Sequence, residues 1–211
     1  MKLNTFKSCF FSLFFIGFSG SVSAEKEMKK SGPEAWIIDK AHSSVAFEVD
    51  HLVIATVEGR FKEFEGEINF DMENPKKTDN FSVHVKIDPS TINTDNEKRD
   101  KHLRSEDFFN VTKHKEMSFK SKKVSTTDGK KFTITGDLTI AGVTRSVDLD
   151  TKYRGSVSAY DVQRVSFQAT TSIKREDFQL TWNNLIEGTP AVGSEISIRL
   201  KIEAKRKSDL S

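Results

Sequence analysis

The chain has 211 residues, of which 30% are charged and 36% are hydrophobic. Its 33 Lys and Arg residues nearly balance its 31 Asp and Glu residues, so the formal net charge is +2 at pH 7. This balance argues against a protein that binds nucleic acid or another polyanion through its overall electrostatic field. A single cysteine, Cys9, excludes an internal disulfide framework.

The first 24 residues have the three parts of a secretory signal peptide. Lys2 and Lys7 form a basic start, residues 10–18 are mostly apolar, and residues 22–24 have the small side chains that signal peptidase requires. We expect cleavage after residue 24, a flexible lead-in over residues 25–34 and an exported, periplasmic protein. Without the leader, 31 basic residues balance 31 acidic ones. No later stretch has about 18 consecutive apolar residues, so no integral membrane segment is expected in the mature chain.

From Trp36 onward, apolar and polar residues alternate with the period of half-buried strands. The predicted strands contain residues 45–49, 68–70, 81–87, 117–125, 132–140, 147–153, 165–173 and 196–204. Most connections have the length of hairpin turns, and Asp128-Gly129 is the clearest turn signal. Gly136 lies on the apolar face of its strand, which indicates a bulge or a bend.

About eight or nine short strands without alternating helices favour an antiparallel sandwich or barrel. At about eight strands, the interior of a barrel is either filled by side chains or holds one small or elongated ligand. Outside the leader, 11 phenylalanines fall mostly on the apolar strand faces. Large aromatic side chains can fill a barrel or line a ligand cavity, so the sequence pattern does not decide between these two outcomes.

Residues 94–109 are predicted to form the one helix that interrupts the strands. Thr94 and Glu97 have the spacing of a capping box. Acid–base pairs at i,i+4 spacing are Asp95–Arg99, Glu97–Lys101 and Asp100–Arg104. Since each pair contributes only about 0.2–0.5 kcal/mol, the helix must dock through Leu103 and the pair Phe108-Phe109.

The sequence contains none of the common enzyme motifs, such as a glycine-flanked serine, a phosphate-binding loop or a histidine pair with metal-ligand spacing. Arg99 and His102 are the best polar candidates, near the side of the helix that carries Leu103. They either meet an anionic or carbonyl head group at the barrel mouth or anchor the helix to strand ends. Asp100 points about 100° away from its neighbours, which is poor geometry for a general base pair with His102.

A second candidate region is the long connection over residues 175–193. It carries Phe178 and Trp182 into a segment that should be exposed. Apolar residues in such a loop either cap the core or form a gate.

Several short blocks follow one another along the chain: Trp36-Ile37-Ile38-Asp39, His42-Ser43, Gly59-Arg60-Phe61, Arg99-Asp100-Lys101-His102-Leu103, Asp107-Phe108-Phe109, Gly136-Asp137-Leu138-Thr139-Ile140, Gly142-Val143-Thr144-Arg145 and Arg175-Glu176-Asp177-Phe178. Together they resemble the YceI family over residues 35–205. The resemblance implies an extended lipocalin-like barrel whose apolar interior accommodates a long isoprenoid chain, of the polyprenyl or isoprenoid quinone type. It also implies a periplasmic or secreted protein, and dimers are known in the family. Gln179 and Glu116 depart from the glycine and proline usual at these positions.

We therefore predict an all-β, extended lipocalin-like antiparallel β-barrel of about eight strands over residues 35–205. A short helical insertion lies near residues 94–109, and residues 206–211 form a C-terminal tail. The protein would bind, and carry or store, an isoprenoid lipid. We expect no catalytic residue, no metal, no cofactor other than the bound lipid and no nucleic-acid partner, and a homodimer is compatible with the resemblance.

The predicted lining residues are Phe47, Val83, Val85, Phe119, Phe132, Leu138, Phe167 and Ile198. Residues predicted near the mouth are Phe108, Phe109, Phe178 and Trp182, with Arg99 and His102 as polar contacts. One alternative is a lipid-acting hydrolase or isomerase that uses His102. Another is a filled barrel that acts as a stress-related interaction protein.

Overall fold

The computed structural model describes residues 32–183, 185–186 and 188–210. The predicted signal peptide and most of the lead-in lie outside these residues. The elements are β1 (Glu34–Ile38), η1 (Lys40–His42), β2 (Ser44–His51), β3 (Ala55–Phe61), β4 (Phe64–Phe70), β5 (Ser82–Ile87), η2 (Pro89–Thr91), β6 (Ile92–Asn93), α1 (Glu97–Leu103), β7 (Met117–Thr126), β8 (Lys131–Ile140), β9 (Val143–Ala159), β10 (Val162–Lys174), η3 (Arg175–Phe178), β11 (Leu185–Ile186), β12 (Thr189–Pro190), β13 (Val192–Arg206) and η4 (Lys207–Asp209), where η marks a 3-10 helix.

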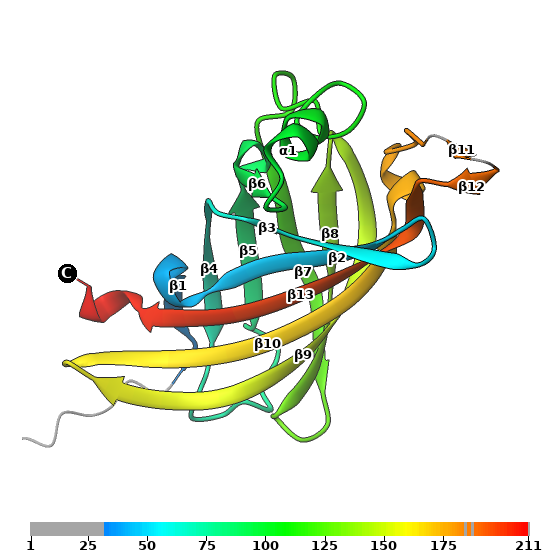
Figure 1. Cartoon of the computed structure of the whole chain (residues 1–211). Helices are drawn as coiled ribbons and strands as arrows, with labels where there is room; N and C mark the ends of the chain where they lie inside the picture. The colour runs from blue at the N-terminus through cyan, green and yellow to red at the C-terminus, as the bar shows by residue number, and fades with distance from the viewer. Residues whose placement is uncertain (1–31, 184, 187, 211) are drawn as a thin grey trace, which may run out of the picture. The chain divides into compact units, whose positions relative to one another are not determined.

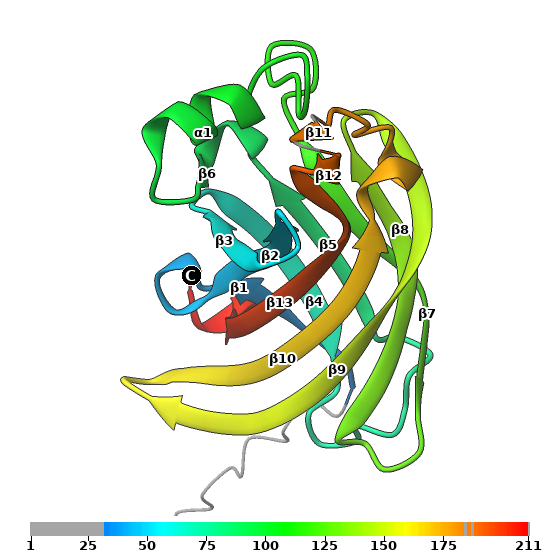
Figure 2. The same ribbon diagram turned by 45° about the vertical axis from the view of Figure 1, so that its right-hand side comes forward.

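Eight of these strands form a closed antiparallel barrel (Figures 1 and 2). Their order is β1-β4-β5-β7-β8-β9-β10-β13, and β1 pairs with β13 to close the ring. The closing pairs join Trp36 to Arg206 and Ile38 to Ala204. Closure turns one face of every strand toward a common interior. The predicted all-β lipocalin-like barrel is confirmed.

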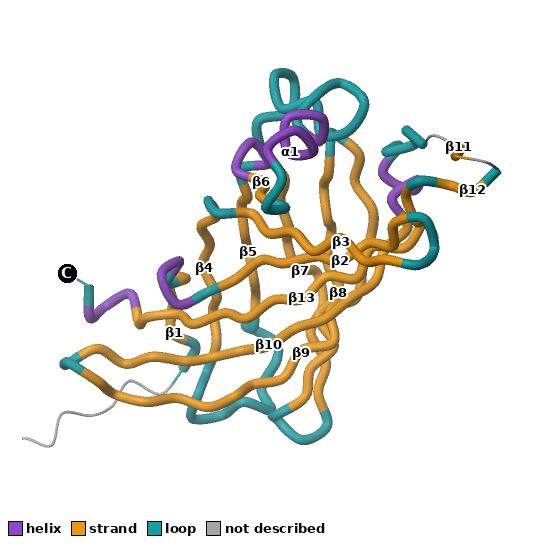
Figure 3. Tube along the Cα trace, viewed as in Figure 1, coloured by secondary structure: helices purple, strands orange, loops and turns teal. Residues whose placement is uncertain are grey.

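Three strands of the ring, β1, β4 and β5, are each joined by a short bend to a strand outside the ring. β1 leads through η1 into β2, β3 leads through residues 62–63 into β4, and β5 leads through η2 into β6 (Figure 3). Asp39 and Asp88 cap η1 and η2, because each carboxylate accepts a hydrogen bond from the backbone N–H two residues later. Thr91 Oγ1 accepts from both N–H groups of residues 62–63, at 3.2 and 3.1 Å. These contacts hold two of the bends together, so β2, β3 and β6 extend the sheet toward α1.

Two features predicted from glycines are confirmed. At the hairpin Asp128-Gly129, the glycine has φ +71° and the aspartate accepts hydrogen bonds from the backbone N–H groups two and three residues later. Gly136 lies opposite Ser121, and the register of the two strands shifts between Ser121 and Lys123. A side chain at position 136 would lie 2.5 Å from the Phe119 ring. The bulge therefore lies on the strand next to the glycine.

The helix is shorter than predicted and is capped by a different residue. Turns follow α1 from residue 104, and Asn96 is the N-cap, with Oδ1 accepting from Arg99 N at 3.0 Å. Thr94 was predicted to be the cap, but it is buried and donates to Asp100 instead. Among the described residues, none of the three predicted i,i+4 pairs forms an ion pair, because Arg99 and Arg104 bind backbone carbonyls outside the helix. Tertiary contacts outweigh weak local pairs here.

Apolar side chains of the strands fill much of the barrel interior. Trp36 is fully buried, and its Nε1–H donates to Phe70 O at 3.0 Å. This contact satisfies the only polar atom of the indole side chain. Within the described residues, no helix has the length and hydrophobicity needed to cross a bilayer.

Candidate functional site

A cavity of about 210 Å³ lies inside the barrel. Every strand of the closed ring contributes to its wall, together with β2, β3, β6, α1 and η3. Among the described residues that line it, the only side chains with polar atoms, apart from the thioether of Met117, are those of Thr151, Thr171 and Arg175. A wall of this kind favours an apolar ligand, because a charged group placed there would lose its hydration without regaining partners.

Ten of the predicted site residues line this cavity, and four do not. Those in the wall are Phe47, Val83, Val85, Phe108, Phe109, Phe119, Leu138, Phe167, Phe178 and Ile198. Those outside it are Arg99, His102, Phe132 and Trp182. Alternation along the strands identified most of the wall, because side chains of one strand face share the barrel interior.

An aromatic group closes the end of the barrel away from α1, where β4 ends and β8 begins (Figure 1). The Phe70 ring contacts Phe81, Phe132, Tyr153 and Phe167, with centroid distances between 5.0 and 6.2 Å. Phe81 and Phe167 also line the cavity. These five residues form its floor, and Phe132 packs within the floor and does not face the open space.

A second aromatic group lies beneath α1. The Phe61 ring contacts Phe47 and Phe109, each with a centroid distance of 5.8 Å. Leu103 is half-buried and packs against the core next to this group. Leu103 and Phe109 therefore dock the helical region on the barrel, which agrees with the role that their position in the sequence predicts. Their side chains form the ceiling of the cavity.

His102 belongs to a third aromatic cluster at the mouth. Its ring lies edge-on to Phe108 and Trp182, with centroid distances of 5.1 and 4.7 Å. Its Nε2 lies 2.9 Å from Asp107 Oδ2. Phe108 lines the cavity, so this cluster joins the turns after α1 to the segment that follows η3. Contact of His102 or Trp182 with a ligand stays a prediction.

Arg99 and Asp100 both bind Thr94, the residue after β6. Asp100 Oδ1 accepts from Thr94 N and Thr94 Oγ1, at 2.9 and 2.6 Å. Arg99 Nε donates to Thr94 Oγ1 and Nη2 donates to Thr94 O, both at 2.8 Å. These bonds anchor α1 to the end of β6, which is one of the two roles open from the sequence.

Arg175 is the one charged residue that the described part of the chain contributes to the cavity wall, and it was not among the predicted site residues. Its side chain is only 5% exposed. Nε donates to Gly193 O at 2.9 Å, and Nη1 donates to the carbonyls of Leu180 and Trp182. Nη2 lies 3.2 Å from Glu176 Oε1. The sequence held a signal for this residue, because Arg175 is the first residue of the Arg-Glu-Asp-Phe block that also contains Phe178. Its partners could not be predicted, because the contacts form only when the loop folds back.

The loop after η3 thus has two parts. Phe178 is 1% exposed and lines the cavity, so it caps the core. Trp182 is half-buried against His102 and Phe108 at the mouth. Phe178 therefore caps the core and Trp182 packs at the mouth, although both belong to one segment.

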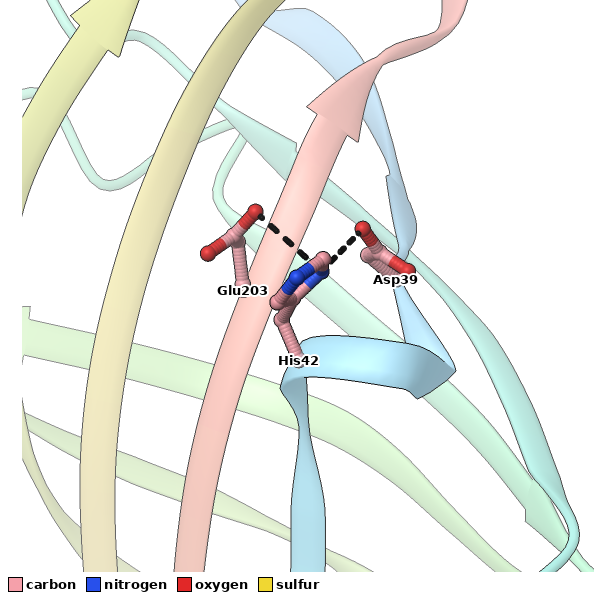
Figure 4. A group of neighbouring side chains, drawn as sticks. All are labelled: Asp39, His42 and Glu203. Atoms are coloured by element: carbon pink, nitrogen blue, oxygen red, sulfur yellow. Dashed lines mark hydrogen bonds and ion pairs between the residues drawn. The ribbon is translucent and has the colours of Figure 1, made fainter.

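A separate polar network lies where β1 bends into β2 (Figure 4). Ligand atoms of Asp39, His42 and Glu203 lie within 4.8 Å of one another, which is compatible with a metal ion. However, Arg164 Nη1 lies 2.7 Å from Glu203 Oε1, and Lys205 Nζ lies 2.8 Å from Asp39 Oδ2. Two cations already neutralise the two carboxylates, so the network suits an ion-pair cluster better than a divalent cation.

The pKa of Asp39 reflects this network. Burial opposes ionisation, but hydrogen bonds from Lys205 and His42 outweigh it and lower the pKa of Asp39 from 3.8 to about 2. The carboxylate therefore stays charged at neutral pH and can cap η1 while it pairs with β13.

A closed antiparallel ring around a hydrocarbon-lined cavity defines a lipocalin-like barrel with an apolar interior. The chain belongs to the YceI-like domain family, whose model matches residues 36–204. Protein YceI of Shigella flexneri is 36% identical over 181 residues, which cover 85% of this chain and 88% of that protein. The UPF0312 protein of Ectopseudomonas mendocina (strain ymp) is 38% identical over 149 residues, covering 69% of this chain and 76% of that protein.

Solved structures show the same fold. The Campylobacter jejuni YCEI protein aligns with a TM-score of 0.65 and 35% identity, covering 80% of this chain and 96% of that one. A polyisoprenoid binding domain from Saccharophagus degradans, implicated in plant cell wall breakdown, aligns with a TM-score of 0.61 over 82% of this chain and 99% of that one. Its identity is 13%, so this likeness concerns the fold alone.

Proposed function

We propose that this protein binds an isoprenoid lipid inside the barrel and carries or stores it. The observation that carries the proposal is the cavity wall, which is hydrocarbon over almost its whole surface. The family assignment and the polyisoprenoid-binding domain with the same fold support the same ligand class. At about 25 cal/mol per Å² of apolar area removed from water, a prenyl chain would gain several kcal/mol without any charged contact.

The size of the cavity limits how much lipid enters without rearrangement. Its volume of about 210 Å³ is below the range of about 300–1,000 Å³ that is usual for ligand pockets. For a long chain to fit, side chains such as Phe47 and Phe109 must change their rotamers, or one end of the chain must stay at the mouth. We infer that the aromatic rings occupy part of the space that a bound lipid would take.

The polar end of the ligand would lie at the mouth. Arg175 lies in the cavity wall, and the Glu176 carboxylate offsets its charge at 3.2 Å. This pairing favours a neutral head with a hydrogen-bond acceptor, such as a quinone carbonyl, over a strongly anionic one. Arg99 and His102 stay as predicted contacts of the outer part of the head.

The test is native mass spectrometry of the protein purified from its own host, followed by lipid extraction and by addition of a polyprenyl alcohol and an isoprenoid quinone. Val85→Phe should reduce the amount bound several-fold, because Val85 faces the cavity. His84→Phe is the matched control, since His84 is on the exposed face of the same strand. No co-purified lipid and no binding of either added compound would overturn the proposal.

An enzymatic role has less support. His102 pairs with Asp107 and not with Asp100, and the Asp100 carboxylate is occupied by Thr94. Neither His102 nor Asp107 lines the cavity.

Export to the periplasm and dimer formation belong to the same proposal. Fractionation of host cells would test export, and sedimentation velocity would test the dimer.

A further inference from the structure

Two turns beside each other present apolar side chains to solvent. In the three-residue turn between β2 and β3, Val53 is 75% exposed and Ile54 is 90% exposed. In the β11–β12 hairpin, Leu185 is 72% exposed. Figure 1 shows both turns on the same side of the barrel, at the right of the view. We call these three residues the apolar tip.

Hydrogen bonds connect the bases of the two turns. Leu52 N donates to Ala191 O at 3.3 Å, and His51 Nδ1 lies 2.7 Å from the same oxygen. His51 also pairs with Val192 across β2 and β13. On the other turn, the Asn183 side chain bonds both backbone polar groups of Val192, at 2.9 and 3.1 Å. These bonds fix the base of each turn to the same short stretch of chain, Ala191 and Val192.

Neither packing nor backbone preference explains these residues. An exposed valine or isoleucine gains nothing from burial in the core. Leu52 and Val53 have φ values of +51° and +65°, a region that glycine and asparagine adopt more readily and that is unfavourable for a β-branched residue. Apolar side chains at a strained, exposed turn indicate contact with an apolar partner.

The apolar tip continues into the cavity wall. Val49 lies two residues before His51, and Val192 pairs with His51, and both valines line the cavity. Leu180, which follows η3, lines it as well. Apolar surface therefore runs from the interior of the barrel to the base of the exposed turns.

We propose that the apolar tip docks on a lipid bilayer, with Val53, Ile54 and Leu185 inserted among the outer parts of the lipids. This inference rests on the proposed function, because a prenyl lipid that is insoluble in water must enter the barrel from a membrane. Docking would bring the cavity wall at Val49 and Val192 against the source of the ligand.

The charge around the apolar tip and its small area favour a membrane over a protein partner. Asp50 and Glu176 lie at the base of the tip, near Gly193 and Ser194, and their negative charge gives anionic lipids no advantage there. Insertion of apolar side chains is then the driving force. The area of three side chains is well below the roughly 800 Å² per partner that a stable protein dimer buries. A second copy of the chain is therefore a less suitable partner for the apolar tip.

The experiment is flotation of the purified protein with phosphatidylcholine vesicles, with and without added phosphatidylglycerol. The wild type should float with both, and the anionic lipid should not increase binding. Ile54→Asp should reduce the bound fraction roughly tenfold. Tyr160→Asp is the matched control and should change it less than twofold, because Tyr160 is 94% exposed in the turn at the other end of β10.

Failure of docking and failure of lipid binding are distinguishable. Prenyl-lipid uptake from detergent, measured by native mass spectrometry, should be the same for wild type and Ile54→Asp. A wild type that takes up lipid but does not float overturns docking alone, and one that floats without taking up lipid overturns only the proposed function. Equal losses for Ile54→Asp and Tyr160→Asp, or a dimer that Ile54→Asp dissociates while flotation is unchanged, also overturn docking.

Discussion

Phe47 and Gly59 face each other across β2 and β3, and the Phe47 ring occupies the space that a side chain at position 59 would need. A Cβ atom at Gly59 would lie 2.3 Å from Phe47 Cζ. Since Phe47 lines the cavity, the glycine determines how far this ring stands from the centre of the barrel.

Gly59→Ala should therefore push the Phe47 ring into the cavity. We expect the bound amount of a polyprenyl alcohol to fall several-fold in native mass spectrometry. Phe47→Leu in the same chain should restore binding, because the smaller side chain leaves room for the new methyl group. Unchanged binding by Gly59→Ala would contradict this prediction, because the Phe47 ring would then have moved without entering the cavity.

Arg175 connects η3 to two carbonyls of the loop that follows it, those of Leu180 and Trp182, and to the Gly193 carbonyl in β13. Arg175→Met should destabilise the protein by about 3 kcal/mol, because three partly buried carbonyl groups and the Glu176 carboxylate lose a buried cationic partner. Urea unfolding measures the loss, and amide exchange should accelerate in residues 180–183. Arg145→Met is the control, since Arg145 is exposed and bonds the carbonyl of its neighbour Thr144. Equal effects of the two substitutions would contradict the assignment.

Asp39→Asn should remove stability in a defined pH range. The pKa of Asp39 is about 2 in the folded protein and 3.8 in the unfolded reference, so the ionised carboxylate stabilises the fold above pH 3.8. This contribution, about 1–2 kcal/mol for a pair near the surface, declines as the pH falls from 3.8 toward 2. Unfolding curves of wild type and variant should differ at pH 7 and converge near pH 2. A constant difference over this range would show that the effect is steric.

His102→Ala tests whether the mouth cluster controls exchange of the ligand. Loss of the ring removes support from Phe108 and Trp182, so release of a bound prenyl lipid should become several-fold faster while equilibrium binding changes little. Stopped-flow transfer of a fluorescent prenyl lipid to vesicles measures the rate. His84→Ala, on the exposed strand face, should leave it unchanged. Complete loss of binding by His102→Ala would instead make His102 a primary ligand contact.

Much of the fold follows from local patterns. Residues 132–140 alternate in the sequence and in the barrel, where Phe132, Ile134, Leu138 and Ile140 are buried. The pleat of a strand forces this outcome, because successive side chains point to opposite faces. The irregularity at Gly136 and the Asp128-Gly129 turn were also predicted, because the backbone conformations that they require depend on neighbouring residues.

The partners of individual side chains were predicted less well. Glu97 and Thr94 matched a capping box, but Asn96 caps α1 and Thr94 is engaged by Arg99 and Asp100. Phe132 and Phe167 were both predicted to line the cavity, and both pack against Phe70 in the floor, but only Phe167 lines the cavity.

Strand alternation and short motifs are properties of neighbouring residues, so the barrel class, the apolar faces and the family could be predicted from the sequence. The place of Arg175 in the cavity wall and the bond from Arg99 to the Thr94 carbonyl became evident only in the folded chain. An arginine that loses contact with water bonds to whichever carbonyls the folded chain brings within hydrogen-bond distance. Sequence spacing cannot specify those partners before the ring is closed.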